Sequence, residues 1–348
     1  MTFDSALLLG VDVGSSRTKA LLVDPDGTEL GSSVVPTPFE SSAGGTEAPV
    51  DSMVAALGTA LDGLGDDRRR VAAVGIAGIA ESGAPLDRHG SPLGPVVAWH
   101  DRRGETVAER LSERFGRDLD LRIGQQIRYV SSVAKLGWLV DNGLTGVARW
   151  LGVPELGLHA LTGAHATEYS LAARTGCFDV SRRSWLPDVA EAAGFGVDGF
   201  ADVGPAGEVM GRVSADAAAW SGLPAGTPVT LAGHDHLAGV VGSGAGVDDL
   251  ANSVGTAETV VGRTSTVPEM DQVLDRSLAV TVFPGGDGWA VLAGAARAGL
   301  AISAAAVTLG LELDELDRLA GGAPLLDAPD LLESLLRRYP PALPDGPP

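Results

Sequence analysis

Short apolar runs separated by turn residues open the chain and predict a β-meander. Residues 6–35 contain three β-like runs, divided first by Gly-Ser-Ser and then by the turn sequence Pro25-Asp26-Gly27. Helical spacing follows from about Val50 to Leu64, and a further strand is expected at Val71 to Ala77. Because sheet and helix alternate in this way, the first part of the chain is predicted to be an α/β lobe.

The middle of the chain has a different pattern. From about Asp101 to Gly199 helical spacing dominates, so this part is predicted to form helical insertions on the first lobe. A second region of strands and glycines begins near Val229, and Ser253 to Thr264 is predicted to be a hairpin. We therefore expect two domains, residues 1–232 and residues 233–348.

The second lobe is predicted to be incomplete. The stretch from Trp289 to Leu313 is mostly Ala and Gly and carries Arg297, so it falls short of a membrane span and is expected to be a buried helix beside a strand. Residues 339–348 hold five prolines in ten residues and cannot form a core element. Only about a hundred residues would then remain for this lobe, less than half the length of the first.

Composition and charge narrow the function. With 348 residues, 45% of them hydrophobic and 20% charged, the chain is predicted to be globular. The 25 basic and 45 acidic residues give a net charge of −20, which disfavours nucleic acid and anionic membranes as partners. A small molecule is therefore the expected partner. The single cysteine, Cys177, cannot form an internal disulfide, and the first residues lack the pattern of a signal peptide, so a cytoplasmic protein is expected. A homodimer is left open.

The first candidate site is the segment Asp12 to Lys19, between two apolar runs. An aspartate at the end of a buried strand, followed by a glycine, hydroxyls and a cation, suits a polyphosphate bound with Mg²⁺. The alternative is an ordinary hairpin turn.

The second candidate site is Gly233-His234-Asp235-His236, which follows an apolar run. A carboxylate held at a strand end can accept a proton from a hydroxyl group as its oxygen attacks phosphorus, which makes Asp235 a candidate base. One alternative is a metal site, because His234 and His236 would share a face of a strand, although no third ligand stands at a recognisable spacing. The other is a helix N-cap aspartate.

Two further segments complete the candidate chemistry. Ser253 to Glu258 repeats the strand, glycine turn and strand seen around Gly14, with a plain β-turn as its alternative. Val74 to Arg103 delivers a carboxylate, an aromatic face and guanidinium groups, which suits a polyhydroxylated ligand. The alternatives are that Glu81 is a solvated loop residue and that Trp99 is a core residue.

Taken in order, these segments resemble the FGGY family of carbohydrate kinases, which holds xylulokinase and glycerol kinase. The resemblance covers about residues 7–310, and it is carried by GVDVGSSRTKALLVD at 10–24, GIAGIAESGAPLDRHGSPLGPVVAWHDRR at 75–103, KLGW at 135–138, LTGAHATEYSLAARTGCFDV at 161–180, AGHDHLAGVVGSGAG at 232–246 and SVGTAETVV at 253–261.

The resemblance implies an actin-like fold in which two ribonuclease-H-like lobes close on Mg-ATP and a sugar or polyol. It implies that the enzyme is a kinase that phosphorylates a hydroxyl group of its substrate. The roles that it implies are Asp235 as catalytic base, Asp12 and Asp235 as metal-associated carboxylates, Gly14, Ser15, Ser16 and Lys19 as the first phosphate loop, Gly255 and Thr256 as the second, and Ala80, Glu81, Trp99, Asp101 and Asp235 at the substrate.

The sequence departs from the family pattern at three places. Xylulokinases typically carry Met-His, and glycerol kinases Arg-Glu, where this chain has Ala80-Glu81, so the sugar stays unnamed. His236 stands where relatives usually have Asn or Gln, and no counterpart of the family's adenosine-binding motif precedes Pro348. Two alternatives to a kinase stay open: a truncated relative that binds sugar without turnover, and a chaperone or filament protein of the actin-like superfamily.

Overall fold

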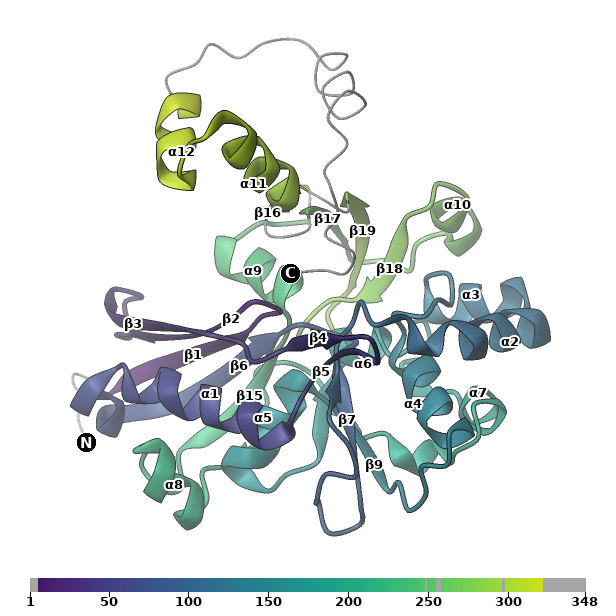
Figure 1. The fold of residues 1–348 in the computed structure, drawn as a ribbon, viewed down its shortest axis with the longest axis horizontal. Helices are drawn as coiled ribbons and strands as arrows, with labels where there is room; N and C mark the ends of the chain where they lie inside the picture. Colours follow the sequence, from purple (N-terminus) through teal and green to yellow (C-terminus); the bar gives the residue numbers. More distant parts are fainter. Residues whose placement is uncertain (1–5, 248, 255–257, 296–297, 322–348) are drawn as a thin grey trace.

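A six-stranded sheet with the order β14-β15-β6-β1-β2-β3 is at the centre of the fold (Figure 1). The computed structural model describes residues 6–247, 249–254, 258–295 and 298–321. Strands β1, β6 and β15 are parallel neighbours, and β1, β2 and β3 form the predicted antiparallel meander. The strands are β1 (Leu7–Val13), β2 (Arg17–Val23), β3 (Glu29–Pro36), β6 (Val71–Gly78), β14 (Gly211–Arg212) and β15 (Pro228–His234).

One face of this sheet packs on helices. Alternate residues of β1, from Leu7 to Val13, are buried, as expected for a strand whose side chains point to opposite faces in turn. They join a core with residues of α1 (Val50–Asp62), α5 (Val153–Thr162) and α8 (Ala215–Ser221). The prediction that all of residues 101–199 are insertions was therefore wrong for α5, because this helix lies against β6 and β15 of the central sheet.

The predicted helical insertions form a second core beside the first. It is built mainly by α2, α3, α4 and α7, which lie at one end of the molecule (Figure 1). A five-stranded sheet with the order β4-β5-β8-β7-β9 lies between the two cores. The remaining elements between residues 40 and 204 are β4 (Glu40–Ser42), β5 (Gly45–Ala48), η2 (Gly65–Arg70), β7 (Gly83–Leu86), β8 (Val96–Val97), η3 (Arg102–Gly104), α2 (Glu105–Phe115), α3 (Arg117–Ile123), α4 (Ser132–Asp141), β9 (Arg149–Gly152), β10 (Ala166–Glu168), α6 (Tyr169–Ala173), β11 (Phe178–Asp179), β12 (Ser184–Trp185), α7 (Pro187–Ala192), η4 (Val197–Gly199) and β13 (Asp202–Gly204).

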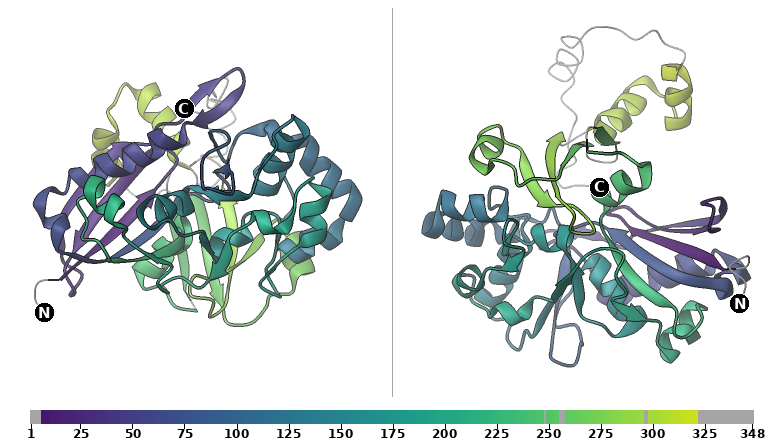
Figure 2. Two further views of the ribbon diagram at one scale, coloured as in Figure 1. Left: turned by 90° about the horizontal axis from the view of Figure 1, so that it is seen from below. Right: turned by 180° about the vertical axis from the view of Figure 1, so that it is seen from behind.

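A second sheet, with the order β16-β17-β19-β18, follows in the chain and is antiparallel throughout (Figure 2). The predicted hairpin is confirmed in its two strands, β16 and β17, while its turn lies outside the described residues. Leu237 and Val240 of α9 pack on this sheet. The elements are α9 (Asp235–Ser243), β16 (Leu250–Val254), β17 (Glu258–Thr264), α10 (Met270–Asp275), β18 (Ala279–Val282) and β19 (Trp289–Ala295).

The predicted boundary between residues 232 and 233 falls inside β15. The last residue of that strand, His234, still pairs with Gly78 of β6 in the central sheet. The change from the first sheet to the second therefore occurs between His234 and Leu250, and α9 is the connection.

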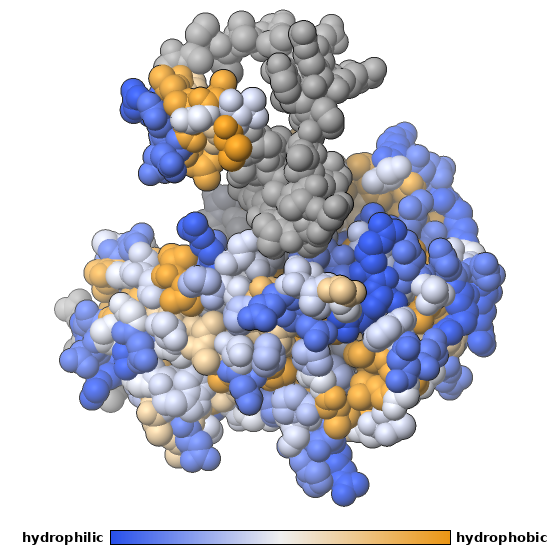
Figure 3. All heavy atoms as spheres, in the orientation of Figure 1, coloured by the Kyte–Doolittle hydropathy of each residue, from blue (hydrophilic) through white to orange (hydrophobic). Residues whose placement is uncertain are grey.

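Two helices close the described part of the chain, α11 (Ala298–Leu309) and α12 (Leu313–Gly321). The prediction of a buried helix was wrong for α11, in which Ile302 is 47% exposed and Val307 is 82% exposed. Figure 3 shows hydrophobic residues on the surface of this pair of helices. In the described residues, no helix has the length and apolar character needed to span a membrane.

Candidate active site

The two predicted carboxylates meet at one edge of the central sheet. The strand register pairs Asp12 of β1 with Ala77 of β6, and Ala77 in turn with Gly233 of β15, so the carboxyl ends of three parallel strands are level. Asp235 begins the helix that follows β15. The predicted domains, 1–232 and 233–348, separate Asp12 from Asp235, but β15, the strand that leads to Asp235, belongs to the same sheet as β1.

Asp12 is close enough to Asp235 for their charges to interact. Burial raises the pKa of Asp12, and the negative charge of Asp235 adds to this rise. Lys19 opposes it, because its Nζ lies 3.0 Å from Asp12 Oδ2. Asp12 Oδ1 is buried and has no hydrogen-bond partner among the described residues, so this oxygen is available to a ligand.

The loop between β1 and β2 is a tight turn. The Gly14 amide donates to Arg17 O at 3.0 Å, and Thr37 Oγ1 donates to Gly14 O at 2.8 Å. The Thr37 amide also donates to Ser16 O at 3.0 Å. Ser15 Oγ accepts a hydrogen bond from Trp99 Nε1 at 2.9 Å, so the structure brings the predicted phosphate loop and the predicted substrate wall into contact.

Asp235 stands at the N-terminus of α9 with one oxygen already engaged. Its Oδ1 accepts from the His236 amide at 2.7 Å and lies 3.1 Å from His234 Nε2. Burial lowers the pKa of His234 to about 4, so this imidazole is neutral at pH 7. The structure departs from both alternative interpretations of this segment: His234, and not Asp235, occupies the N-cap position, and His236 lies on the helix rather than on the strand.

Gly233 positions this segment against a buried carboxylate. Its φ of 108° is in the region that favours glycine, and an added Cβ would lie 2.7 Å from Ser170 Oγ and 2.9 Å from Glu168 Oε2. The His234 amide donates to Ser170 Oγ at 2.9 Å, and Ser170 Oγ is also hydrogen-bonded to Glu168 Oε2. Burial raises the pKa of Glu168 to about 7, against the hydrogen bonds from Ser170. Neither Glu168 nor Ser170 was predicted from the sequence to have a role at the site.

The predicted substrate loop follows β6 at the same edge of the sheet. Ala80 and Glu81 both line a cavity, together with Ser132, Trp150 and Glu155. Glu81 has a positive φ of 65°, which is uncommon for a residue with a side chain. Its carboxylate pairs with Arg174, so it is not the solvated loop residue of the alternative interpretation.

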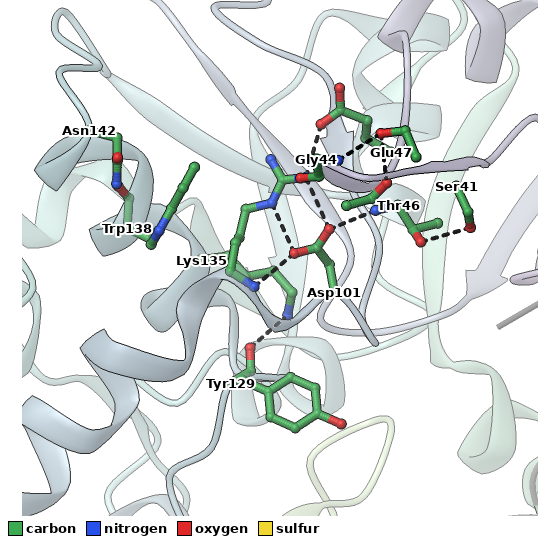
Figure 4. A network of polar contacts seen from close by, with 12 residues as sticks. Ser41, Gly44, Thr46, Glu47, Asp101, Tyr129, Lys135, Trp138 and Asn142 are labelled. Atoms are coloured by element: carbon green, nitrogen blue, oxygen red, sulfur yellow. Dashed lines mark hydrogen bonds and ion pairs between the residues drawn. The ribbon is translucent and has the colours of Figure 1, made fainter. Parts of the chain in front are cut away.

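Asp101 does not join this group of residues. Its side chain is 1% exposed, and its oxygens accept hydrogen bonds from the Thr46 amide at 2.7 Å and from the Arg103 amide and guanidinium (Figure 4). Burial alone would raise the pKa of Asp101, but the hydrogen bonds from Arg103 and Thr46 outweigh it and lower the pKa. These contacts correct the expectation of a substrate ligand: Asp101 anchors the turn between β4 and β5. Gly255 and Thr256, the predicted second phosphate loop, lie outside the described residues.

Two charged residues near the site were quoted for the resemblance but given no role. Arg174 binds Glu81 and Gln125. Lys135 is fully buried, and its Nζ donates to Tyr129 O at 3.2 Å and to Val130 O. The signal in the sequence was a single lysine within the apolar run Val133 to Val140, where a side chain is expected to be buried. Because an unpaired lysine is rarely buried, a lysine at such a position indicates specific polar partners.

Comparisons with known proteins extend these observations. The N-terminal domain of the FGGY family of carbohydrate kinases matches residues 7–242. The chain is 34% identical over 168 residues to an L-fuculokinase of Salmonella typhi, covering 47% of this chain and 35% of that protein. It is 27% identical over 216 residues to a glycerol kinase of Thermococcus gammatolerans, covering 59% of this chain and 44% of that protein. The chain spans about half the length, or less, of the curated relatives it matches.

The fold is also similar to solved structures. A crystal structure of a xyloylose kinase from Brucella ovis matches with a TM-score of 0.80 at 21% identity, covering 93% of this chain and 67% of that one. This likeness confirms the predicted actin-like α/β fold. Since the matched domain covers well over half of the chain, the chain belongs to the FGGY family of carbohydrate kinases.

Proposed function

We propose that this chain is an ATP-dependent kinase that phosphorylates a hydroxyl group of a sugar, ketose or polyol. The observation that carries the proposal is the placement of Asp12 and Asp235 at one sheet edge, near enough for the charge of one to raise the pKa of the other. Relatives described as L-fuculokinase and glycerol kinase support the same class of reaction.

In this proposal Asp235 accepts the proton of the substrate hydroxyl. Its Oδ1 is held by the His236 amide, which fixes the orientation of the carboxylate. No hydrogen-bond partner of Oδ2 lies among the described residues, and the residue is only partly buried. One oxygen is thus fixed and the other can reach a substrate, as a general base requires.

Asp12 and the first loop are the proposed phosphate side of the site. The unpartnered, buried Asp12 Oδ1 fits a hard cation such as Mg²⁺, which prefers oxygen ligands. Bound Mg-ATP would supply the phosphoryl group and the neutralisation of its charge. Lys19 adds a positive charge beside Asp12. Ser15 and Ser16 offer amides and hydroxyls, and Gly14, whose own amide donates to Arg17 O, forms the tight turn that presents them. Gly255 and Thr256 are retained as the proposed second phosphate loop.

The proposed sugar side comprises Ala80, Glu81 and Trp99. Arg174 holds the Glu81 carboxylate, leaving acceptor capacity for hydroxyl groups, because a carboxylate accepts several hydrogen bonds. Trp99 is tied to both loops, since its amide donates to Ser82 Oγ at 2.8 Å and its indole to Ser15 Oγ. An aromatic face held in this way can pack against the apolar side of a sugar ring.

The proposal is tested with Asp235→Asn in an assay of ADP release across a panel of sugars and polyols. Loss of the base is expected to lower kcat by about 10²–10⁴-fold, with little effect on sugar affinity measured by calorimetry. Asp216→Asn, an exposed aspartate on α8, is the matched control and should retain full turnover. Retained turnover in Asp235→Asn would remove Asp235 from its role. Sugar binding by the native chain without ATP binding would instead support a relative that does not turn over.

A further inference from the structure

His234, Asp235 and His236 bring three potential metal ligands together at the junction of β15 and α9. One ligand atom from each residue lies within 4.8 Å of the other two. His234 Nε2 and Asp235 Oδ1 are 3.1 Å apart. Two ligands bound at about 2.0–2.1 Å to a tetrahedral ion are separated by roughly 3.3 Å, so this spacing is close to that of a coordination site.

The junction itself creates the cluster. On a continuous strand, side chains of consecutive residues point to opposite faces, and Asp235 would point away from both histidines. The strand ends at His234 and the helix begins at Asp235, which turns the carboxylate to the side of the imidazoles. The sequence therefore suggested two ligands, and the structure adds the third.

The histidine rings are held in place by their surroundings. His236 Nδ1 lies 2.8 Å from Ser253 Oγ of β16, and the two histidine rings meet edge to face with centroids 5.2 Å apart. The His234 amide is fixed by Ser170 Oγ. The contact of His236 Nδ1 with Ser253 is of the kind that orients metal-binding imidazoles in known sites, whereas the bond to Ser170 fixes the backbone of His234.

We propose that His234, Asp235 and His236 bind a borderline transition-metal ion, with Zn²⁺ as the probe, at a site separate from the proposed Mg²⁺ position at Asp12. Two imidazole nitrogens and one carboxylate oxygen suit Zn²⁺ and leave a fourth position open to water, whereas Mg²⁺ prefers oxygen ligands alone. The only thiol, Cys177, is buried and cannot compete. Occupation would engage the carboxylate assigned as base and so inhibit turnover; this consequence alone rests on the proposed function.

The test is direct binding to the purified full chain, which needs no turnover. Calorimetry with Zn²⁺ is expected to show one site per chain, and a millimolar excess of Mg²⁺ should not displace the ion. His236→Asn should weaken this site by about tenfold or more, since even outer-shell changes cost 10–100-fold in affinity. His165→Asn is the matched control, because His165 belongs to the stacked pair with His159 and lies outside the cluster.

X-ray absorption spectroscopy of the Zn²⁺-loaded native chain keeps the test valid if a variant fails to fold. The expected spectrum shows two imidazole ligands, oxygen ligands and no sulfur. The proposal is overturned if no zinc binds at millimolar concentration, if His165→Asn removes the site while His236→Asn leaves it unchanged, or if the spectrum lacks two imidazoles. A chain that binds zinc at this cluster but never releases ADP refutes the kinase and leaves the metal site standing.

Discussion

Lys135 is a fully buried lysine, and lysine is among the residues that are rarely buried without a partner. Burial lowers its pKa to about 7, although the carboxylates of Glu81 and Asp101 act in the opposite direction. Its ammonium donates to two backbone carbonyls, of Tyr129 and Val130, just before α4. Lys135 therefore ties the segment before α4 to the helix itself, and Figure 4 shows its position beside Asp101.

The depressed pKa of Lys135 predicts a pH dependence of stability. An unfolded lysine keeps its proton up to about pH 10.5, whereas the folded residue loses it above about pH 7, so the unfolded state binds more protons in this window. The free energy of unfolding should therefore rise with pH between 7 and 10.5, by up to about 1.4 kcal/mol per pH unit. Lys135→Met should remove this rise, as measured by urea unfolding of both proteins. Equal slopes would contradict the burial of a titrating amine; Lys19→Met, at an exposed lysine, is the control.

Gly233 gives a second prediction at the scale of a residue. Gly233→Ala must accommodate a Cβ at a φ of 108° against Ser170 and Glu168, and the expected cost is about 1–3 kcal/mol of unfolding free energy. The same change at Gly239, on the exposed side of α9, meets no atom within 4 Å and should be neutral or stabilising, because alanine favours a helix. Chemical denaturation of both variants checks the difference. A harmless Gly233→Ala would show that the segment before Asp235 is not constrained.

Helix α3 makes two kinds of contact, charged ones to α10 and apolar ones within the core of the helical insertions. Arg117 pairs with Asp271 and Asp275 of α10 at 3.0 Å and 2.6 Å, but all three side chains are at least 45% exposed. Leu119, on the same helix, is fully buried in the second core. Exposed ion pairs contribute little to stability, whereas a buried leucine contributes through packing.

We therefore expect the two kinds of contact on α3 to differ sharply. Arg117→Ala should lower the free energy of unfolding by at most about 1 kcal/mol, and Leu119→Ala by about 2–5 kcal/mol. Both values come from equilibrium urea unfolding, with the two variants as controls for each other. A larger loss from Arg117→Ala would mean that the charged contacts, rather than the core, attach this helix.

Elements with a strong local pattern were predictable from the sequence. The meander, α1 and β6 have clear periodicity, and the strands of the β16–β17 hairpin were expected where they are found. The placement of α5 against the central sheet was not, since its apolar spacing does not say which core it joins. The same limit applies to Asp235: its strand was recognised, but the sheet to which the strand belongs depends on long-range pairing with β6.

At the scale of the whole molecule, the sequence predicted which residues form the candidate site. It did not predict how their side chains are arranged or which of them already have partners. Asp12, Glu81 and Asp235 were identified, and the structure brings their loops to one sheet edge. Asp101 was misassigned because a carboxylate with ordered partners cannot be distinguished from a free one by sequence. Glu168 and Arg174 were given no role, because their partners are far away in the sequence. Glu168 reaches His234, 66 residues further on, through Ser170. Arg174 binds Glu81, which lies 93 residues before it.

The net charge of −20 gives a prediction for the whole molecule. Repulsion among acidic groups acts over long distances, whereas the ion pairs of this structure lie within 4.0 Å. Raising NaCl from about 0.01 M to 0.15 M shortens the screening length from about 30 Å to about 8 Å, which weakens the repulsion more than the pairs. The melting temperature at pH 7 should therefore rise, by on the order of 1–2 °C for a chain of 348 residues if about 1 kcal/mol is gained. Choline chloride should act like NaCl in the same thermal scan. A melting temperature that falls with salt would show that surface ion pairs outweigh the repulsion.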